Sequence, residues 1–310
     1  MAKRSTYNGP KPEEKLVADL VAMLESADLP PWRKPWHASG GGRHRNLLSG
    51  HLYSGANPIL LEMGALMAGH SMPLWVGYGQ AKAKGWLPAK GSKGARILRP
   101  QLNKREQTDE NGDTVVSAWV SFKVVSVFNA GALTGVDDAS AETLDRAIRE
   151  AVGSWPQLPQ DQRCERAETA LEAWPVPTTF RGERAFYSPS HDAITMPDRS
   201  RFRDPEALCA TWAHEQAHST GHDSRLKRDL SGTFGSDSYS REELVAELAS
   251  VLICQRLEIG CQLENHAAYL KGWSQTLKTP RDLFQILSAA RAAADLIVPD
   301  DGSNATVADE

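Results

Sequence analysis

The sequence predicts an α+β protein of two domains, and three observations lead to this prediction. First, charge divides the chain, because residues 1–130 hold 17 lysines and arginines against 10 acids and residues 131–310 hold 18 against 29. Second, the basic part contains valine-rich and aromatic runs typical of strands, whereas the acidic part consists mainly of helical patterns. Third, 310 residues with 41% hydrophobic side chains can bury two cores. We therefore expect a small basic α+β domain over residues 1–132 and a mainly helical domain with a short sheet over residues 133–298.

Local signals define the elements of the basic domain. Leucines at helical spacing predict a first helix over residues 12–26, which the prolines after it terminate. A second helix is expected to begin at Asn57-Pro58, because proline suits a first helical turn. Residues 94–100 and 115–129 are predicted strands, and the polar segment 104–114 is predicted to be the hairpin connection between them.

The acidic part begins with two amphipathic helical patterns, at residues 140–152 and 162–174. Residues 133–175 therefore form either a connector or the opening of the second domain. Residues 183–197 predict two short strands joined by a turn. A strong helix start follows at Asp204-Pro205, with aspartate as the N-cap and proline at the first helical position. Further helices are predicted from Ser240 and over residues 265–278 and 281–298.

Neither a membrane span nor a secretion signal is expected. No apolar run approaches the roughly 20 residues that a bilayer requires, and the amino terminus lacks the apolar core of a signal peptide. The cysteines, Cys164, Cys209, Cys254 and Cys261, include no C-x-x-C pair and are interpreted as buried reduced thiols. These features predict a cytoplasmic protein, with a small, polar and acidic tail over residues 299–310 that is disordered.

Residues 211–226 read TWAHEQAHSTGHDSRL and place His214, Glu215 and His218 in the order His-Glu-x-x-His. Two histidines four residues apart on a helix project from one face and can bind one ion. Glu215, next to the first histidine, can then take a proton from a water molecule. The pattern indicates a metal-dependent hydrolase.

The third metal ligand is expected on the next helix. A histidine six residues after His218 would complete a longer motif, but that position is Ser224. The sequence SREELVAELAS instead offers glutamates, of which Glu243 and Glu247 share a face. We expect Glu243 to be the ligand and Glu247 to hold a histidine through its free ring nitrogen. Glu247 is the replacement ligand if Glu243 merely caps its helix in a capping box with Ser240.

Other residues near the motif are candidates for supporting roles. His222 either supports or replaces a ligand, or it ends its helix, where a cation suits the helix dipole. A donor that stabilises the transition state is expected beside the metal, and the candidates, which the sequence does not rank, are Tyr239, His222, His191 and His266. Residues 192–197 are expected at a sheet edge where an extended peptide could pair, the alternative being that Ile194 and Met196 simply face the core.

The basic half has the composition of a surface that binds single strands. Between residues 33 and 105 there are twelve basic residues and one acid, Glu62. Aromatic rings stack on unpaired bases while cations neutralise phosphates, and this combination holds single strands without reading sequence. Tryptophans are more often buried than exposed, and the pair in WRKPW is the one most expected at the surface. The candidate contacts are Trp32, Arg33, Lys34, Trp36, Arg45, Tyr53, Tyr78, Lys84, Lys90, Lys93 and Arg96, with Trp75 and Trp86 as further aromatic residues.

Several segments resemble a known family. PWRKPW, NLLSGHLYSGANPILL, WVGYGQAKAKGWLPAKGSKGARI and VFNAGALTG resemble the amino-terminal single-stranded-DNA-binding domain of ArdC-type antirestriction proteins, a domain related to part of some conjugative primases. YSPSHDAITMP, HEQAHSTGHDSRLKRDL and YSREELVAE resemble the zincin-like metallopeptidase domain that follows it in that family. The resemblance spans almost the whole chain except the tail. It implies a zincin-like second domain and adds Gln80 to the candidate DNA contacts.

The resemblance and the residues together predict a mobile-element protein that protects incoming DNA from host restriction. The expected cofactor is Zn²⁺, with another divalent ion such as Mn²⁺ as the alternative, held by His214, His218 and Glu243, and Glu215 is the expected catalytic base. The expected partners are single-stranded DNA, duplex DNA as a weaker ligand, and a protein substrate for which the host restriction machinery is a candidate. Two alternatives are a non-catalytic protein that occludes DNA and uses the metal as a structural staple, and an accessory to conjugative DNA priming.

Overall fold

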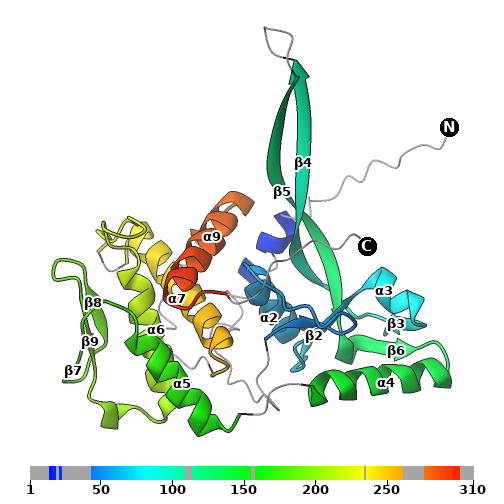
Figure 1. Ribbon diagram of the computed structural model, residues 1–310, viewed down its shortest axis with the longest axis horizontal. Helices are drawn as coiled ribbons and strands as arrows, with labels where there is room; N and C mark the ends of the chain where they lie inside the picture. The colour runs from blue at the N-terminus through cyan, green and yellow to red at the C-terminus, as the bar shows by residue number, and fades with distance from the viewer. Residues whose placement is uncertain are drawn as a thin grey trace.

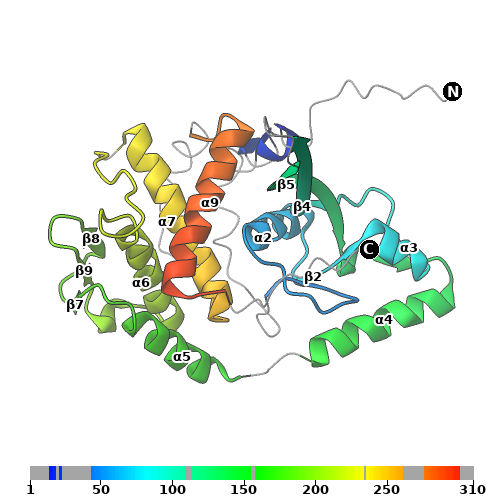
Figure 2. The same ribbon diagram turned by 45° about the horizontal axis from the view of Figure 1, so that its top comes forward.

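The fold consists of a sheet-based N-terminal half and a mainly helical C-terminal half (Figures 1 and 2), which confirms the predicted α+β fold of two domains. It is known from a computed structural model that describes residues 14–18, 21–22, 43–108, 114–154, 158–233, 235–260 and 276–300. No helix within these ranges is long and apolar enough to cross a bilayer.

A four-stranded sheet in the order β1-β2-β5-β4 forms the centre of the N-terminal half. One face of the sheet packs on α2 through Leu61 and Trp75, and the base of the other face packs through Val76 on Trp86 and Leu144. The sheet is therefore covered on both faces at its base. The elements of this half are β1 (Arg45–Asn46), α2 (Asn57–Ala68), β2 (Leu74–Gly77), α3 (Tyr78–Ala83), β3 (Trp86–Pro88), β4 (Ala95–Thr108), β5 (Thr114–Asn129), the 3₁₀ turn η2 (Ala130–Ala132), β6 (Leu133–Gly135) and α4 (Asp138–Gly153).

Strands β4 and β5 continue past the covered base as a two-stranded arm, residues 99–108 and 114–123, that rises away from the rest of the molecule (Figure 1). They pair without interruption from Ala95 with Val127 to Thr108 with Thr114. The predicted hairpin connection over residues 104–114 is therefore too long, because most of it belongs to strands. Beyond the packed base of a sheet, pairing does not require alternation of apolar residues, so the period-2 signal did not predict how far these strands continue.

The C-terminal half packs three long helices around one core. Residues of α6, α7 and α9 such as Ala213, Leu244 and Ile286 are buried together. The described cysteines, Cys164, Cys209 and Cys254, are buried and form no disulfide with one another. Cys261 lies outside the described residues. The helix predicted over residues 265–278 lies largely outside them. The elements are α5 (Gln160–Glu172), β7 (Thr178–Phe180), β8 (Phe186–Ser188), β9 (Ala193–Met196), the 3₁₀ turn η3 (Arg199–Arg201), α6 (Pro205–Ser219), α7 (Asp237–Arg256) and α9 (Pro280–Ile297).

The small sheet of this half corrects one expectation. Its order is β7-β9-β8, so β9, which was expected to be an edge strand, is the central strand. Ile194 and Met196 of β9 are 1% and 0% exposed and belong to the core. The three-residue strand β7 was not predicted, because so short a run has no measurable periodicity. The edge beside α6 is formed by β8.

The caps of α6 and α7 decide which side chains face each other. Asp204 caps α6 as predicted, because its Oδ1 accepts a hydrogen bond from the Ala207 N–H at 2.8 Å. Helix α7 begins before the predicted Ser240, since Ser236 accepts a hydrogen bond from the Tyr239 N–H at 3.2 Å. Glu243 consequently lies inside the helix and takes no part in a capping box, which leaves its carboxylate available for contacts with α6.

Residues 133–153 pack with the N-terminal half. Strand β6 pairs with β3, and a Cβ added to Gly135 would lie 2.2 Å from the Ala141 backbone nitrogen, so β6 and α4 are in close contact. Leu144 of α4 is buried against Trp86. The boundary between residues 132 and 133 stays a prediction, and we propose a division after α4 instead.

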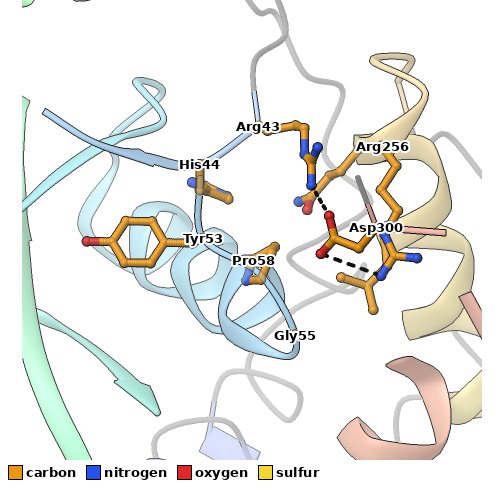
Figure 3. Close-up of a pocket in the computed structure, with 9 residues that line it drawn as sticks. Arg43, His44, Tyr53, Gly55, Pro58, Arg256 and Asp300 are labelled. Atoms are coloured by element: carbon orange, nitrogen blue, oxygen red, sulfur yellow. Dashed lines mark hydrogen bonds and ion pairs between the residues drawn. The ribbon is translucent and has the colours of Figure 1, made fainter. Parts of the chain in front are cut away.

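The two halves meet at a charged joint (Figure 3). Asp300, which follows α9, forms an ion pair with Arg43 of the N-terminal half, and its carboxylate lies 4.0 Å from the Arg256 guanidinium of α7. Beneath these charges, Ile59 and Leu60 of α2 are buried in the same core as α6, α7 and α9. The expected disordered tail thus has an ordered contact at its beginning, and residues 301–310 lie outside the described residues.

Gly64 tests the close packing of α2 on the sheet. A Cβ at this position would lie 2.4 Å from the Cβ of Ala95, so Gly64→Ala is expected to lower the free energy of unfolding by about 1–3 kcal/mol in urea denaturation. Gly79→Ala in α3 is the control, because no heavy atom lies within 4 Å of the added Cβ and alanine favours a helix. An unchanged urea midpoint for Gly64→Ala would contradict the close approach.

Candidate metal centre

The predicted motif residues lie at the contact between α6 and α7. His214, Glu215 and His218 extend from α6, and Glu243 extends from α7. His214, Glu215 and Glu243 are 7–8% exposed, and the side chain of His218 is 14% exposed. Burial of so many polar groups is costly unless each one has a partner of suitable charge.

Three ligand atoms converge at one point. The two histidine Nε2 atoms are 3.1 Å apart, and the Glu243 carboxylate oxygens lie 3.6 Å from each of them. An ion bound tetrahedrally at 2.0–2.1 Å would separate its ligand atoms by about 3.3–3.5 Å. The three groups all lie within 4.8 Å of one another and therefore fit a divalent metal ion.

The outer nitrogens of both histidines face carboxylates of α7. His218 Nδ1 is 3.2 Å from Glu242 Oε1, and His214 Nδ1 is 3.6 Å from Glu247 Oε2. The hydrogen bond of His218 is of the kind that fixes ring orientation and directs the other nitrogen towards a metal, whereas the separation at His214 is longer than a hydrogen bond. Glu247 is 0% exposed and lies at the outer nitrogen where a supporting residue was expected, whereas Glu243 faces the inner nitrogens.

Glu242 and Arg228 are the functional candidates to which the sequence analysis gave no role. The Arg228 guanidinium donates two hydrogen bonds to the Glu242 carboxylate, at 2.7 and 2.8 Å, and two more to Thr220 and to the Ala217 carbonyl at the end of α6. Arg228 thereby ties the C-terminal end of α6 to α7. The adjacent pair Glu242-Glu243 offers a signal for this role, since neighbouring helical residues point in directions about 100° apart and can reach different histidines.

Glu215 lies beside β8 rather than among the three ligands. Burial raises the pKa of its carboxyl, against the opposing effect of His214 and His218, and the carboxylate accepts a hydrogen bond from the backbone N–H of Tyr187. The Tyr187 hydroxyl donates to Asp192 at 2.8 Å, and Arg225 binds the same carboxylate. A raised pKa makes the Glu215 carboxylate a stronger base than an exposed glutamate.

The metal-ligand candidates shift one another's pKa. Burial works against charge on His218, but the hydrogen bond to Glu242 and the charge of Glu243 outweigh it and raise the pKa of His218 to about 9. Burial likewise disfavours the charged form of Glu243, but the hydrogen bond from His214 and the charge of His218 lower its pKa to about 2. The site therefore favours a carboxylate close to positive charge.

The remaining candidates divide by their distance from this centre. The Tyr239 side chain forms a hydrogen bond with Glu243 and so lies beside it. His222 Nδ1 instead contacts the Ser224 hydroxyl at 2.8 Å, and it is not part of the ligand cluster. His191 is exposed and contacts Ser188 at 3.0 Å, while His266 lies outside the described residues.

The predicted DNA contacts differ in exposure. Lys84, Lys90 and Lys93 are exposed, and Tyr78 is 49% exposed. Arg45 and Arg96 are partly exposed, and burial lowers the pKa of Arg45, which lies near the joint. Trp32, Arg33, Lys34 and Trp36 lie outside the described residues.

Three candidate rings and one amide serve the fold instead. Tyr53, Trp75 and Trp86 are 8%, 1% and 2% exposed and belong to hydrophobic clusters, so their faces are covered by other side chains. The Gln80 amide oxygen accepts hydrogen bonds from the Gly77 N–H at 3.2 Å and from the Asn46 side chain at 3.1 Å. These contacts hold α3 against β1 and β2.

The metal-free protein is expected to lose stability as pH rises from about 6.5 to about 9. The pKa of His218 is raised from 6.5 to about 9 in the fold, so its stabilising contribution is complete below the unfolded value and disappears as pH rises through the folded value. Urea unfolding of chelator-treated protein at pH 6 and pH 9 measures this loss, and His218→Asn is expected to reduce it. Identical pH dependence in both proteins would contradict this assignment.

Two family models match the chain, one on each half. Residues 11–128 match the N-terminal domain of the anti-restriction factor ArdC, and residues 165–292 match a zincin-like metallopeptidase. Among curated proteins, a DNA primase TraC of Escherichia coli is 35% identical over 303 residues, which are 93% of this chain but only 27% of that protein. The chain thus spans about a quarter of that relative. A protein named y4eC of Sinorhizobium fredii is 30% identical over 290 residues, covering 91% of this chain and 90% of its own length.

Solved structures show the same relationship. The antirestriction ArdC protein from the R388 plasmid is similar in its metal-free crystal structure, with a TM-score of 0.65, 28% identity, and coverage of 93% of this chain and 97% of that one. Its Mn(II)-bound structure is similar with a TM-score of 0.62 and 27% identity. The chain therefore belongs to the family of ArdC-type antirestriction proteins and carries an ArdC N-terminal domain followed by a zincin-like metallopeptidase domain.

Proposed function

We propose that this protein shields incoming DNA of a mobile element from host restriction, binding single-stranded DNA with its N-terminal half and hydrolysing peptide bonds with its C-terminal half. The observation that carries the proposal is the convergence of His214, His218 and Glu243, with Glu215 beside them. Three protein ligands leave a coordination position open, as catalytic zinc sites do, whereas structural zinc sites use four. Zn²⁺ is the proposed ion and Mn²⁺ the alternative.

The residues of the chain divide the proposed chemistry among them. A bound divalent ion would supply positive charge that makes water more acidic and polarises a carbonyl group. Glu215 would accept the proton of the attacking water and later donate it to the leaving amine, for which its raised pKa is suited. Tyr239, in hydrogen-bond contact with Glu243, is the proposed donor to the developing oxyanion. Edge strand β8, whose Tyr187 N–H meets Glu215, is the proposed site for pairing with an extended peptide.

The N-terminal half supports binding that does not depend on sequence. Lys84, Lys90 and Lys93 are exposed cations that can neutralise phosphates, and Tyr78 exposes a ring on which a base can stack. Residues 32–36 add further aromatic and basic side chains to the proposal, and they lie outside the described residues. We propose single-stranded DNA as the main ligand, duplex DNA as a weaker one, and action in the cytoplasm.

A second candidate function is protection by occupancy alone, with the metal as a structural staple. One observation favours it, namely the burial of His214, Glu215 and Glu243 to 7–8% exposure, because a peptidase must admit its substrate. A role beside a conjugative primase is a further candidate, since the protein named TraC matches over 93% of this chain. Glu215 distinguishes the first two, because a structural metal site has no use for a base beside its ligands.

Glu215→Gln is the variant that tests the proposed function. In cells that receive unmodified DNA, this variant is expected to lose protection from restriction, because removing a catalytic base lowers hydrolysis on the order of 100-fold or more. Zinc measured in the purified variant is expected to equal that of the wild type. Glu172→Gln, at an exposed glutamate of α5, is the matched control and is expected to protect fully. Full protection by a metal-loaded Glu215→Gln protein would favour occupancy instead.

A further inference from the structure

The arm formed by β4 and β5 exposes apolar side chains on one face. Phe122 is 60% exposed and Leu102 is 66% exposed, among the most exposed large hydrophobic residues that the structure describes. Phe122 pairs directly with Pro100, and Leu102 lies two residues beyond Pro100 on the same strand. Because directly paired residues share a face and alternate residues of a strand do too, these three side chains form one apolar surface.

The charged residues where the arm joins the base of the sheet, a segment called the stem here, are all basic. Residues 96–104 and 118–126 contain Arg96, Arg99, Lys104 and Lys123 and no acid. Arg99 and Lys123 are directly paired across the strands, although like charges in that position are destabilising. An anionic ligand would turn this cost into an attraction. Arg96 and Lys104 lie on the same face as Phe122 by the same alternation.

The apolar face of the arm leads towards a predicted DNA contact. Phe122, Ser126 and Phe128 occupy alternate positions of β5 and so share a face. The ring of Phe128 contacts that of Tyr78 on α3, with centroids 6.3 Å apart. Lys93 precedes β4 at the base of the same strand pair. One face of β5 thus runs from the exposed ring of Tyr78 to the exposed ring of Phe122, and α3 lies beside the base of the strands in Figure 1.

We propose that the arm is a second contact site for single-stranded nucleic acid, in which Phe122 stacks on a base and Arg96 and Lys104, which lie on the same face, neutralise the neighbouring phosphates. The inference rests on the proposed binding of single-stranded DNA and extends it away from the base of the sheet. Exposed aromatic rings among cations are the combination that holds unpaired bases. The apolar face could also pack on a second copy of this chain. Such a dimer would bring the cations of the two stems close together, and their repulsion disfavours it.

The test is the affinity of the full chain for fluorescently labelled oligothymidines, measured by anisotropy. For a strand of about 20 nucleotides, which can span both sites, Phe122→Ala is expected to weaken binding by about tenfold. For a strand of about 6 nucleotides, which one site can hold, the loss is expected to be small. Phe122→Tyr keeps a ring for stacking and is expected to bind the long strand as the wild type does.

Two controls separate the outcomes. Leu296→Ala removes an exposed apolar side chain, 43%, from α9 of the C-terminal half and is expected to leave DNA affinity unchanged. Lys104→Gln removes one exposed cation from the face of Phe122 and is expected to lower the dependence of log affinity on log salt by about one contact. If Phe122→Ala binds the long strand as tightly as the wild type does, the arm is not a DNA contact, while the proposed function stands. The same conclusion follows if Phe122→Ala converts a dimer of the protein to a monomer in sedimentation and leaves DNA binding unaltered. Failure of the wild type to bind either strand would instead contradict the proposed function itself.

Discussion

The packing of α6 against α7 is the constraint on which the rest of the structure depends. It buries two histidines beside Glu242, Glu243 and Glu247, three carboxylates on one helix. Buried charges of one sign are costly, and Arg228 balances only Glu242 through its two hydrogen bonds. Glu243 and Glu247 face the two histidines instead, and a divalent cation held by His214, His218 and Glu243 would add further positive charge at this contact.

This helix pair also connects the rest of the molecule to the site. Beside α6, edge strand β8 brings the Tyr187 N–H to Glu215 and is held by the ion pair of Asp192 with Arg225. Near the other end of α7, Arg256 lies at the joint where Asp300 binds Arg43 of the N-terminal half. A single helix therefore carries metal-ligand candidates on one stretch and contacts the N-terminal half on another. Its two roles are joined by rigid secondary structure.

Helix starts that depend on neighbouring residues could be predicted from the sequence, whereas side-chain contacts between distant segments could not. Asp204-Pro205 begins α6 as predicted, because a cap and a first-turn proline act within one turn. Whether Ser236 or Ser240 caps α7 could not be decided from local spacing, since both are good caps. The pairing of Glu242 with Arg228 joins residues of two different segments that no short-range pattern links. The burial of Trp75 and Tyr53 likewise depends on α2 covering the sheet, so the local sequence could not decide which of the rings are exposed.

The most direct test of the central claim is the metal content of the purified protein after dialysis against zinc and then against metal-free buffer. With α6 and α7 assembling a three-ligand site, the wild type is expected to retain about one zinc per chain and Glu243→Gln to retain far less. Glu150→Gln, at an exposed glutamate of α4, is expected to match the wild type. Stoichiometric zinc in a folded Glu243→Gln protein would contradict the account, because the ligand set would then lie elsewhere.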